Sequence, residues 1–183
     1  MNSVEILLKQ TKDAYHWVNK LTASVPAELW EKIPDVIGSS VSWQVGHLVI
    51  STYYHSIMVI AGHQPEILNA LPLKQYTKLF GYNTLPQDTV GTIPPAELQS
   101  ALSYLQSASL SIIGKLSPEE LKDALVPMPV EHPVAKNKFE ALDWNVKHTM
   151  WHCGQIAILM RVVDKGFDFG VKIPGSRATN PSK

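Results

Sequence analysis

Residues 137–165 of the chain read NKFEALDWNVKHTMWHCGQIAILMRVVDK, and this stretch decides the fold because it predicts one long helix. Asn137 followed three residues later by Glu140 is typical of a helix N-terminus, and Gly166 after the stretch is a stop signal. At about 100° per residue, one narrow solvated stripe collects Asp143, Lys147, Gly154, Arg161 and Lys165. The opposite side of the helix is largely apolar, so it must pack against other parts of the chain.

Three further segments repeat apolar residues at intervals of three and four and are predicted to be helices: about 4–21, 41–62 and 95–113. The second of them is apolar nearly all round, so it is either central in the fold or at a subunit interface. Between the second and third segments, residues 63–94 contain several prolines and glycines and predict a long connection. We therefore predict an all-α fold, a four-helix bundle with a long crossover between helices 2 and 3. We expect a single domain over residues 1–174 and a polar, frayed tail over residues 175–183.

Composition and charge exclude several classes of protein. The 183 residues contain 16 Lys and Arg and 16 Asp and Glu, so the formal net charge is zero. This balance argues against a nucleic-acid binder, because such proteins gain much of their affinity by neutralising phosphates with positive charge. One cysteine permits no intrachain disulfide and suits a reducing compartment. The N-terminus shows no basic region before an apolar stretch, and no run approaches about 18 apolar residues. We expect a cytoplasmic protein with neither nucleic acid nor membrane as its partner.

Two of the seven histidines, His148 and His152, have a spacing with chemical meaning. They lie one helical turn apart, so both imidazoles leave the same face, opposite the solvated stripe. Two such rings can share a metal ion at about 2.0–2.1 Å from each nitrogen. Thr149 stands where a zincin motif has its glutamate, so the pair is not a zincin site. The alternative is a pair of structural histidines that satisfy each other through water.

A catalytic zinc ion usually has three protein ligands and an open position, so a third ligand must come from elsewhere in the chain. His47 in the second segment is the best candidate, because it shares a face with large core-type residues such as Trp43, Tyr54 and Met58. His55 is more than a quarter turn away from that face. We expect the remaining histidines to be solvated or to make a single hydrogen bond: His16, His55, His63 and His132.

Residues 40–48 (SVSWQVGHL) and 148–156 (HTMWHCGQI) together resemble the DinB/YfiT-like superfamily of metalloenzymes. Its members carry a histidine seven residues into the second helix and an H-x-x-x-H-x-G-Q-I/L stretch in the fourth. The resemblance extends over about residues 1–165. It implies that His47, His148 and His152 are three metal ligands. It further implies a four-helix bundle, a divalent metal ion such as zinc or nickel, and a homodimer.

A divalent ion held by three neutral imidazoles keeps open positions and lowers the pKa of bound water toward about 7. The same ion would turn a small thiol into a thiolate. Some branches of the family are thiol-dependent transferases or isomerases, and others are described as hydrolases. We therefore expect a metal-dependent enzyme for a small-molecule substrate, either a hydrolase or a thiol S-transferase that uses a low-molecular-weight thiol. The alternative is a non-catalytic metal-binding or stress-response module.

Other residues are candidates for supporting roles. Tyr54, two turns after His47, is a candidate catalytic donor of a proton or hydrogen bond, and a core tyrosine is the alternative reading. Gln155 or Asn145 is expected to orient a ligand histidine, with a packing amide as the alternative. Gly154 in mid-helix predicts the close approach of another backbone.

Two larger features are also expected to serve the site or the assembly. The connection over residues 63–94 is a candidate cover for the open side of the metal, with Tyr76, Phe80 and Tyr82 as its aromatic residues. A passive crossover is the alternative. The apolar second helix is expected to form the interface of a homodimer.

Overall fold

The computed structural model of the chain describes residues 1–170, and these residues form helices and no strand. The predicted all-α class is therefore confirmed for the described part of the chain. No helix within it is long and apolar enough to cross a membrane. The predicted tail over residues 175–183 lies outside the described residues.

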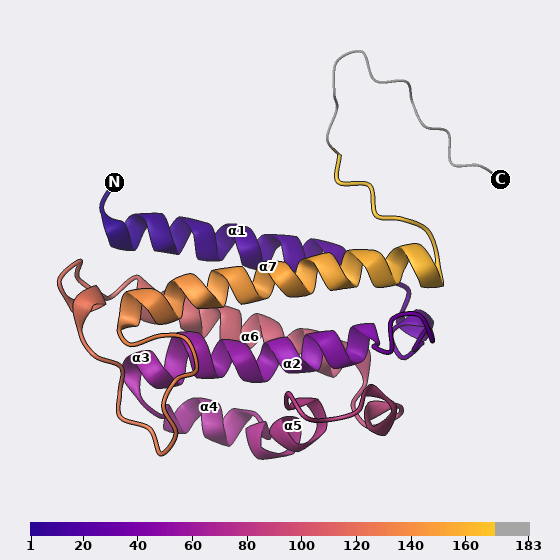
Figure 1. The fold of residues 1–183 in the computed structure, drawn as a ribbon, viewed down its shortest axis with the longest axis horizontal. Coiled ribbons are helices and arrows are strands. Elements are labelled where there is room, and N and C mark those ends of the chain that lie inside the picture. Colours follow the sequence, from indigo (N-terminus) through magenta and orange to yellow (C-terminus); the bar gives the residue numbers. More distant parts are fainter. Residues whose placement is uncertain (171–183) are drawn as a thin grey trace, which may run out of the picture.

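Four long helices pack along one another, as Figure 1 shows: α1 (Ser3–Ala23), α2 (Val41–Tyr53), α6 (Pro95–Ile113) and α7 (Lys138–Val163). Helix α1 contacts α6 and α7, and α2 contacts the same two helices. The bounds of α1, α6 and α7 agree with the predicted segments to within two residues at each end. Hydrophobic periodicity located these helices because one face of each is buried.

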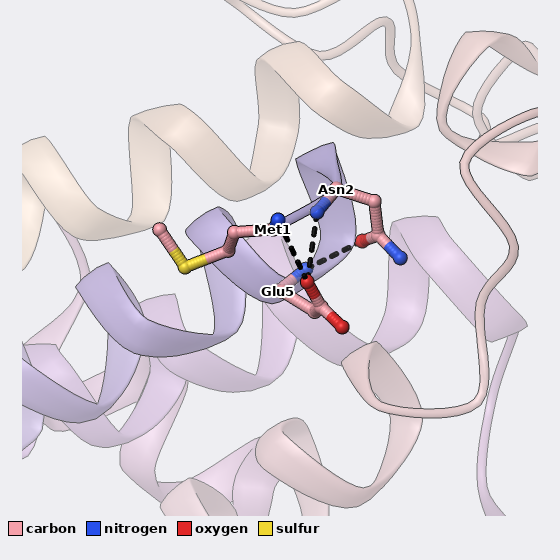
Figure 2. A network of polar contacts seen from close by, with 3 residues as sticks. All are labelled: Met1, Asn2 and Glu5. Carbon is pink, nitrogen blue, oxygen red and sulfur yellow. Dashed lines mark hydrogen bonds and ion pairs between the residues drawn. The ribbon is translucent and has the colours of Figure 1, made fainter.

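Side-chain caps from Asn2, Ser40 and Asn137 set where α1, α2 and α7 begin. At α1, the Oδ1 atom of Asn2 accepts the Glu5 N–H at 2.9 Å, and the Glu5 carboxylate accepts the Asn2 N–H at 2.8 Å (Figure 2). The carboxylate also lies 3.7 Å from the Met1 ammonium. At α7, Asn137 Oδ1 accepts the Glu140 N–H at 2.9 Å, which confirms the predicted N-terminus of that helix. Such caps pair N–H groups that have no partner inside the helix.

Helix α2 continues beyond Tyr53 through a π-helical turn, η2 (Tyr54–Met58), and a last turn, α3 (Val59–Ala61). The Val59 N–H reaches the carbonyl of Tyr54, five residues earlier, which is the π-helical pattern. The helix ends at Gly62, whose φ of +80° is accessible to glycine at low cost. The predicted segment 41–62 is thus one helix with a widened turn, and side chains after that turn depart from α-helical register.

The apolar character of α2 is accounted for within one chain. Helices α5 (Leu73–Phe80), α6 and α7 all contact α2, and its core side chains are almost wholly buried. They belong to the larger of two hydrophobic clusters and include Val41, Val45, Leu48 and Val49. Of the two readings of this helix, the central position is therefore correct. The homodimer stays a prediction. Its expected interface on α2 was argued from an uncovered apolar face, and α2 has no such face because other helices of the same chain cover it.

The connection after Gly62 is more ordered than its prolines predicted. It contains α4 (Pro65–Ala70), α5 and a 3-10 turn, η3 (Pro86–Thr89). Tyr76 and Phe80, one turn apart on α5, are buried in the larger core cluster. A Cβ atom on Gly46 would lie 2.3 Å from the Phe80 ring, so glycine is required for α5 to pack this closely on α2. Tyr76 and Phe80 are core residues rather than a cover over the site.

The segment between α6 and α7 is largely irregular and runs back toward the end of α2. It contains η4 (Glu120–Lys122), just before which the Ser117 hydroxyl accepts the Glu120 N–H at 3.2 Å and the Glu120 carboxylate accepts the Ser117 N–H at 2.7 Å. The Val126 N–H donates to the carbonyl of Val59 at 2.9 Å and fastens this segment to the end of α2. The remaining 3-10 turn, η1 (Ala27–Leu29), precedes the buried Trp30.

Candidate metal centre

His47 lies on α2, and two neighbours set the orientation of its ring. Its Nδ1 atom is 2.8 Å from the carbonyl oxygen of Phe80, and only a protonated Nδ1 can donate to that oxygen. Trp43, one turn earlier, stacks on the ring with 5.1 Å between centroids and 11° between planes. A neutral ring with its proton on Nδ1 carries a lone pair on Nε2. The Nε2 atom of His47 is therefore the one that is able to bind a metal ion.

His152 on α7 is oriented by Gln44, a residue of α2. The Nδ1–H of His152 donates to the Oε1 atom of Gln44. The Nε2 atom of Gln44 donates to the Ser39 hydroxyl at 2.9 Å, and this second bond holds the amide in place beside the histidine. His152 therefore also carries its lone pair on Nε2, and this atom lies 3.2 Å from Nε2 of His148.

The three predicted histidines, His47, His148 and His152, come together between α2 and α7. Their ring centroids lie 4.6–5.3 Å apart, and one nitrogen from each ring lies within 4.8 Å of the other two. Two nitrogens bound about 2.0–2.1 Å from one tetrahedral ion lie about 3.4 Å apart, close to the 3.2 Å between His148 and His152. Imidazole is a preferred ligand of zinc, nickel and copper. The donor set and its spacing fit a divalent transition-metal ion.

Burial favours the neutral form of all three rings. It lowers the pKa of His47, and it lowers the pKa of His148 to about 4 and that of His152 to about 2. The charge on neighbouring histidines adds to the effect at His148 and His152. Neutral imidazole is the form that binds metal, so the site does not have to lose protons near neutral pH before it can coordinate an ion.

The cluster opens onto a cavity of about 1150 Å³. Aromatic and aliphatic side chains form most of its wall, among them Trp43, Ile50, Tyr54, Met58, Trp144 and Trp151. Of the residues 63–94 that were a candidate cover, Tyr82 does line this cavity, together with side chains of α4 and α5. A cavity of this size with apolar walls and a few polar groups is typical of a small-molecule site.

The residue that orients a ligand histidine differs from the two that were predicted. Asn145 donates to the Tyr15 hydroxyl at 3.1 Å, deep between α1 and α7, and is a packing amide. Gln155 lines the cavity, whereas Gln44 makes the hydrogen bond to His152. Sequence reasoning missed Gln44, although it lies nearly one turn before His47 within the stretch that carries the family resemblance.

Tyr54 lines the same cavity, but its aromatic neighbours are His55 and His132 rather than the three-histidine cluster. It stacks on His132 with 5.3 Å between centroids and 1° between planes, and it meets His55 edge-on at 5.0 Å. Burial raises the pKa of Tyr54, so its hydroxyl keeps its proton at neutral pH. Tyr54 is thus suited to donate a hydrogen bond to a molecule in the cavity.

His55 and His132 form a pair that sequence reasoning did not foresee. Nδ1 of His55 and Nε2 of His132 lie 2.8 Å apart, so His55 makes the single bond expected of it but is buried rather than solvated. His55 also meets His148 edge-on, with 5.4 Å between centroids. His55 lies within the π-helical turn, as its second residue.

The two remaining histidines lie apart from the cluster, as expected. His16 is exposed on α1, and His63 bonds the Tyr53 hydroxyl at 3.1 Å. The expectation for Gly154 is wrong within the described residues. A Cβ atom at that position would meet nothing within 4 Å, so no other backbone of the described chain approaches it.

Comparisons with known proteins give a family and a fold. The sequence model of the DinB superfamily matches residues 10–156, a range that contains all three clustered histidines. A crystal structure of a conserved protein from Enterococcus faecalis superposes with a TM-score of 0.68 at 16% sequence identity. The match covers 89% of this chain and 98% of that one, and it shows the fold alone. No curated protein matches this sequence.

Proposed function

Because the chain belongs to the DinB superfamily, we propose that His47, His148 and His152 hold a divalent metal ion, zinc or nickel, in a metal-dependent enzyme. One observation carries the proposal. The Nδ1 atoms of His47 and His152 each face an oxygen that can only accept a hydrogen bond. Both rings therefore carry their lone pair on Nε2, and one nitrogen of each lies within 4.8 Å of a nitrogen of His148. This is the arrangement of metal-binding histidines with oriented outer partners.

When bound, such an ion supplies the acidity that turns a water molecule or a small thiol into a nucleophile near neutral pH. We therefore propose a hydrolase or a thiol S-transferase acting on a small molecule. The protein's own contribution is orientation and exclusion of water. Trp43 stacks on His47 and Trp144 stacks on His148, and the apolar wall of the cavity surrounds the cluster.

Tyr54 is proposed as the hydrogen-bond donor to the substrate in this site. It lines the cavity and stays protonated because burial raises its pKa. Its stacking on His132 holds the ring in one orientation. A donor fixed in this way stabilises negative charge that develops on a substrate oxygen, without delivering a full charge of its own.

We also propose that the four long helices form a four-helix bundle, with the segment between Gly62 and Pro95 as its crossover. The contacts of α1 and α2 with both α6 and α7 support this arrangement. Residues 1–174 are proposed as one domain. A homodimer stays part of the proposal as a prediction to be checked by the mass of the protein in solution.

Metal analysis of purified protein tests the site. We expect about one equivalent of zinc or nickel in the wild type and little in His148→Gln/His152→Gln. A His16→Gln variant, altered at the exposed histidine of α1, is the matched control and should keep its metal. Equal metal content in the double variant and the wild type would contradict the proposal.

Cobalt substitution separates an enzyme from a closed metal-binding module. Azide or a small thiol should change the visible spectrum of the cobalt protein if the site keeps an exchangeable position. An unchanged spectrum would favour the non-catalytic alternative. Activity screens of ester, amide and electrophilic substrates, run with and without added glutathione or cysteine, then distinguish hydrolysis from thiol transfer.

A further inference from the structure

Hydrogen bonds around the His55–His132 pair determine where each ring carries its proton. Nδ1 of His132 accepts two backbone N–H groups, from Val134 at 3.2 Å and from Ala135 at 2.9 Å. A neutral His132 must therefore carry its proton on Nε2, and this group donates to Nδ1 of His55 at 2.8 Å. His55 in turn carries its own proton on Nε2.

The Nε2–H group of His55 has no protein partner among the residues that the structure describes. The side chain is only 7% exposed, and it lines the cavity. Among the described residues, two polar side-chain atoms are fully enclosed and lack a hydrogen-bond partner: Thr11 Oγ1 and Ser42 Oγ. His55 Nε2 is not one of them, so this atom is still accessible from the cavity. A largely buried donor is costly to leave without an acceptor, and the cavity is the side from which an acceptor can come.

The residues in the cavity wall restrict which kind of molecule can supply that acceptor atom. Within the described chain, no carboxylate lines the cavity, and Lys74 is its one lysine or arginine. A cationic ligand would therefore find no counter-charge there. Trp43, Trp144 and Trp151 offer aromatic surface instead, which favours a flat apolar body.

We propose that His55 donates a hydrogen bond from Nε2 to a carbonyl-type oxygen of a largely apolar substrate without positive charge, bound beside the three-histidine cluster. His132 is the positioning residue that holds His55 in the donor tautomer. The proposal deepens the function proposed above, and it rests on that function for the identity of the cavity as the substrate site.

Nitrogen-15 NMR of the histidine side chains tests the tautomer. In wild-type protein as purified, we expect His55 with its proton on Nε2 and Nδ1 unprotonated. His132→Ala should shift His55 toward a mixture of tautomers, whereas His63→Ala should not, because His63 lines the cavity but bonds Tyr53. A wild-type His55 with its proton on Nδ1 would overturn the proposal.

Two probes of similar shape test the donor: 2-acetonaphthone, an aromatic ketone, and 2-isopropenylnaphthalene, the corresponding hydrocarbon. Binding is followed by quenching of tryptophan fluorescence, and the measured quantity is the ratio of their affinities. We expect this ratio to shift about five-fold against the ketone in His55→Phe, the value of one net hydrogen bond. His132→Ala should shift it in the same direction, and His16→Ala, altered at an exposed histidine of α1 outside the cavity wall, should leave it unchanged.

Each outcome bears on one proposal. A ratio that is unchanged in both His55→Phe and His132→Ala overturns the donor role, and the second variant decides the matter if the first does not fold. Failure of the wild type to bind either probe contradicts the apolar substrate class. Zinc content measured in the same samples should be equal in wild type and His132→Ala. Absence of metal from wild type would instead count against the metal site, independently of the probe ratio.

Discussion

Gln44 on α2 accepts the Nδ1–H of His152 on α7, and 108 residues of sequence separate the two. The bond joins the two helices that carry the histidine cluster and leaves Nε2 of His152 unprotonated. Gln44 is itself buried and held by Ser39, so the acceptor oxygen cannot turn away without breaking a second hydrogen bond. The geometry of a metal ligand on α7 thus depends on an amide of α2.

Replacing Gln44 by leucine should weaken metal binding, because the Nδ1–H of His152 loses its acceptor and the ring loses its fixed orientation. We expect the zinc dissociation constant to rise about ten-fold or more. Competition with a chromophoric chelator measures it. Gln155→Leu is the control, since Gln155 lines the cavity without bonding a ligand ring and should leave the constant unchanged. Equal constants for Gln44→Leu and wild type would remove Gln44 from the site.

Asn145→Ala should separate stability from metal binding. The Asn145 amide donates to the buried Tyr15 hydroxyl, which also bonds Ser109 at 2.9 Å. Its loss should lower the free energy of unfolding by about 1–3 kcal/mol and leave zinc affinity unchanged. Urea denaturation of the metal-free protein and chelator competition give the two values. A marked loss of zinc affinity would show that Asn145 does act on the ligands.

Two glycines give opposite expectations for the same substitution. Gly46→Ala forces a methyl group into the Phe80 ring, whose nearest atom would be 2.3 Å away, so we expect a loss of about 1–3 kcal/mol of stability. Zinc affinity should also fall, because the Phe80 carbonyl orients His47. Gly154→Ala meets nothing within 4 Å and should raise stability by up to about 1 kcal/mol through helix propensity. Thermal or urea unfolding that ranks the two variants in the reverse order would contradict this packing.

The metal-free protein should lose stability in mild acid because of its buried histidines. Burial lowers the pKa of His148 to about 4 and that of His152 to about 2, whereas unfolded histidine titrates near pH 6.5. Below about pH 6.5 the unfolded chain therefore binds more protons than the folded one, so acidification favours unfolding. The stability associated with the neutral rings is fully present above that pH and is lost progressively as the pH falls toward 4 and below.

Urea midpoints of protein stripped with EDTA, measured between pH 7.5 and 4, test this expectation. Other groups also titrate in acid, so the decisive comparison is with His148→Gln/His152→Gln. The double variant should show a shallower fall in midpoint over the same range. Parallel curves for the two proteins would mean that these rings are solvated in the metal-free fold.

Local features of the chain were predictable from the sequence. Apolar side chains at intervals of three and four located the long helices, because a helix that buries one face must repeat at that interval. The Asn137–Glu140 cap and the stop at Gly62 depend on backbone groups only a few residues away. The same local geometry predicted that His148 and His152 share one face of their helix. In the structure they form one cluster with His47.

Tertiary structure alone decided what surrounds that cluster. The partners of His47 and His152 are the Phe80 carbonyl and the Gln44 amide, and each contact depends on how separate helices pack rather than on any local spacing. His55 is paired with His132, 77 residues later in the chain, a contact that local periodicity cannot anticipate. The sequence by itself therefore determined the helices and the ligand candidates, because short-range hydrogen bonds and burial of one face specify them. The tautomers, the outer hydrogen bonds and the cavity arise only when residues distant in the chain are brought into contact.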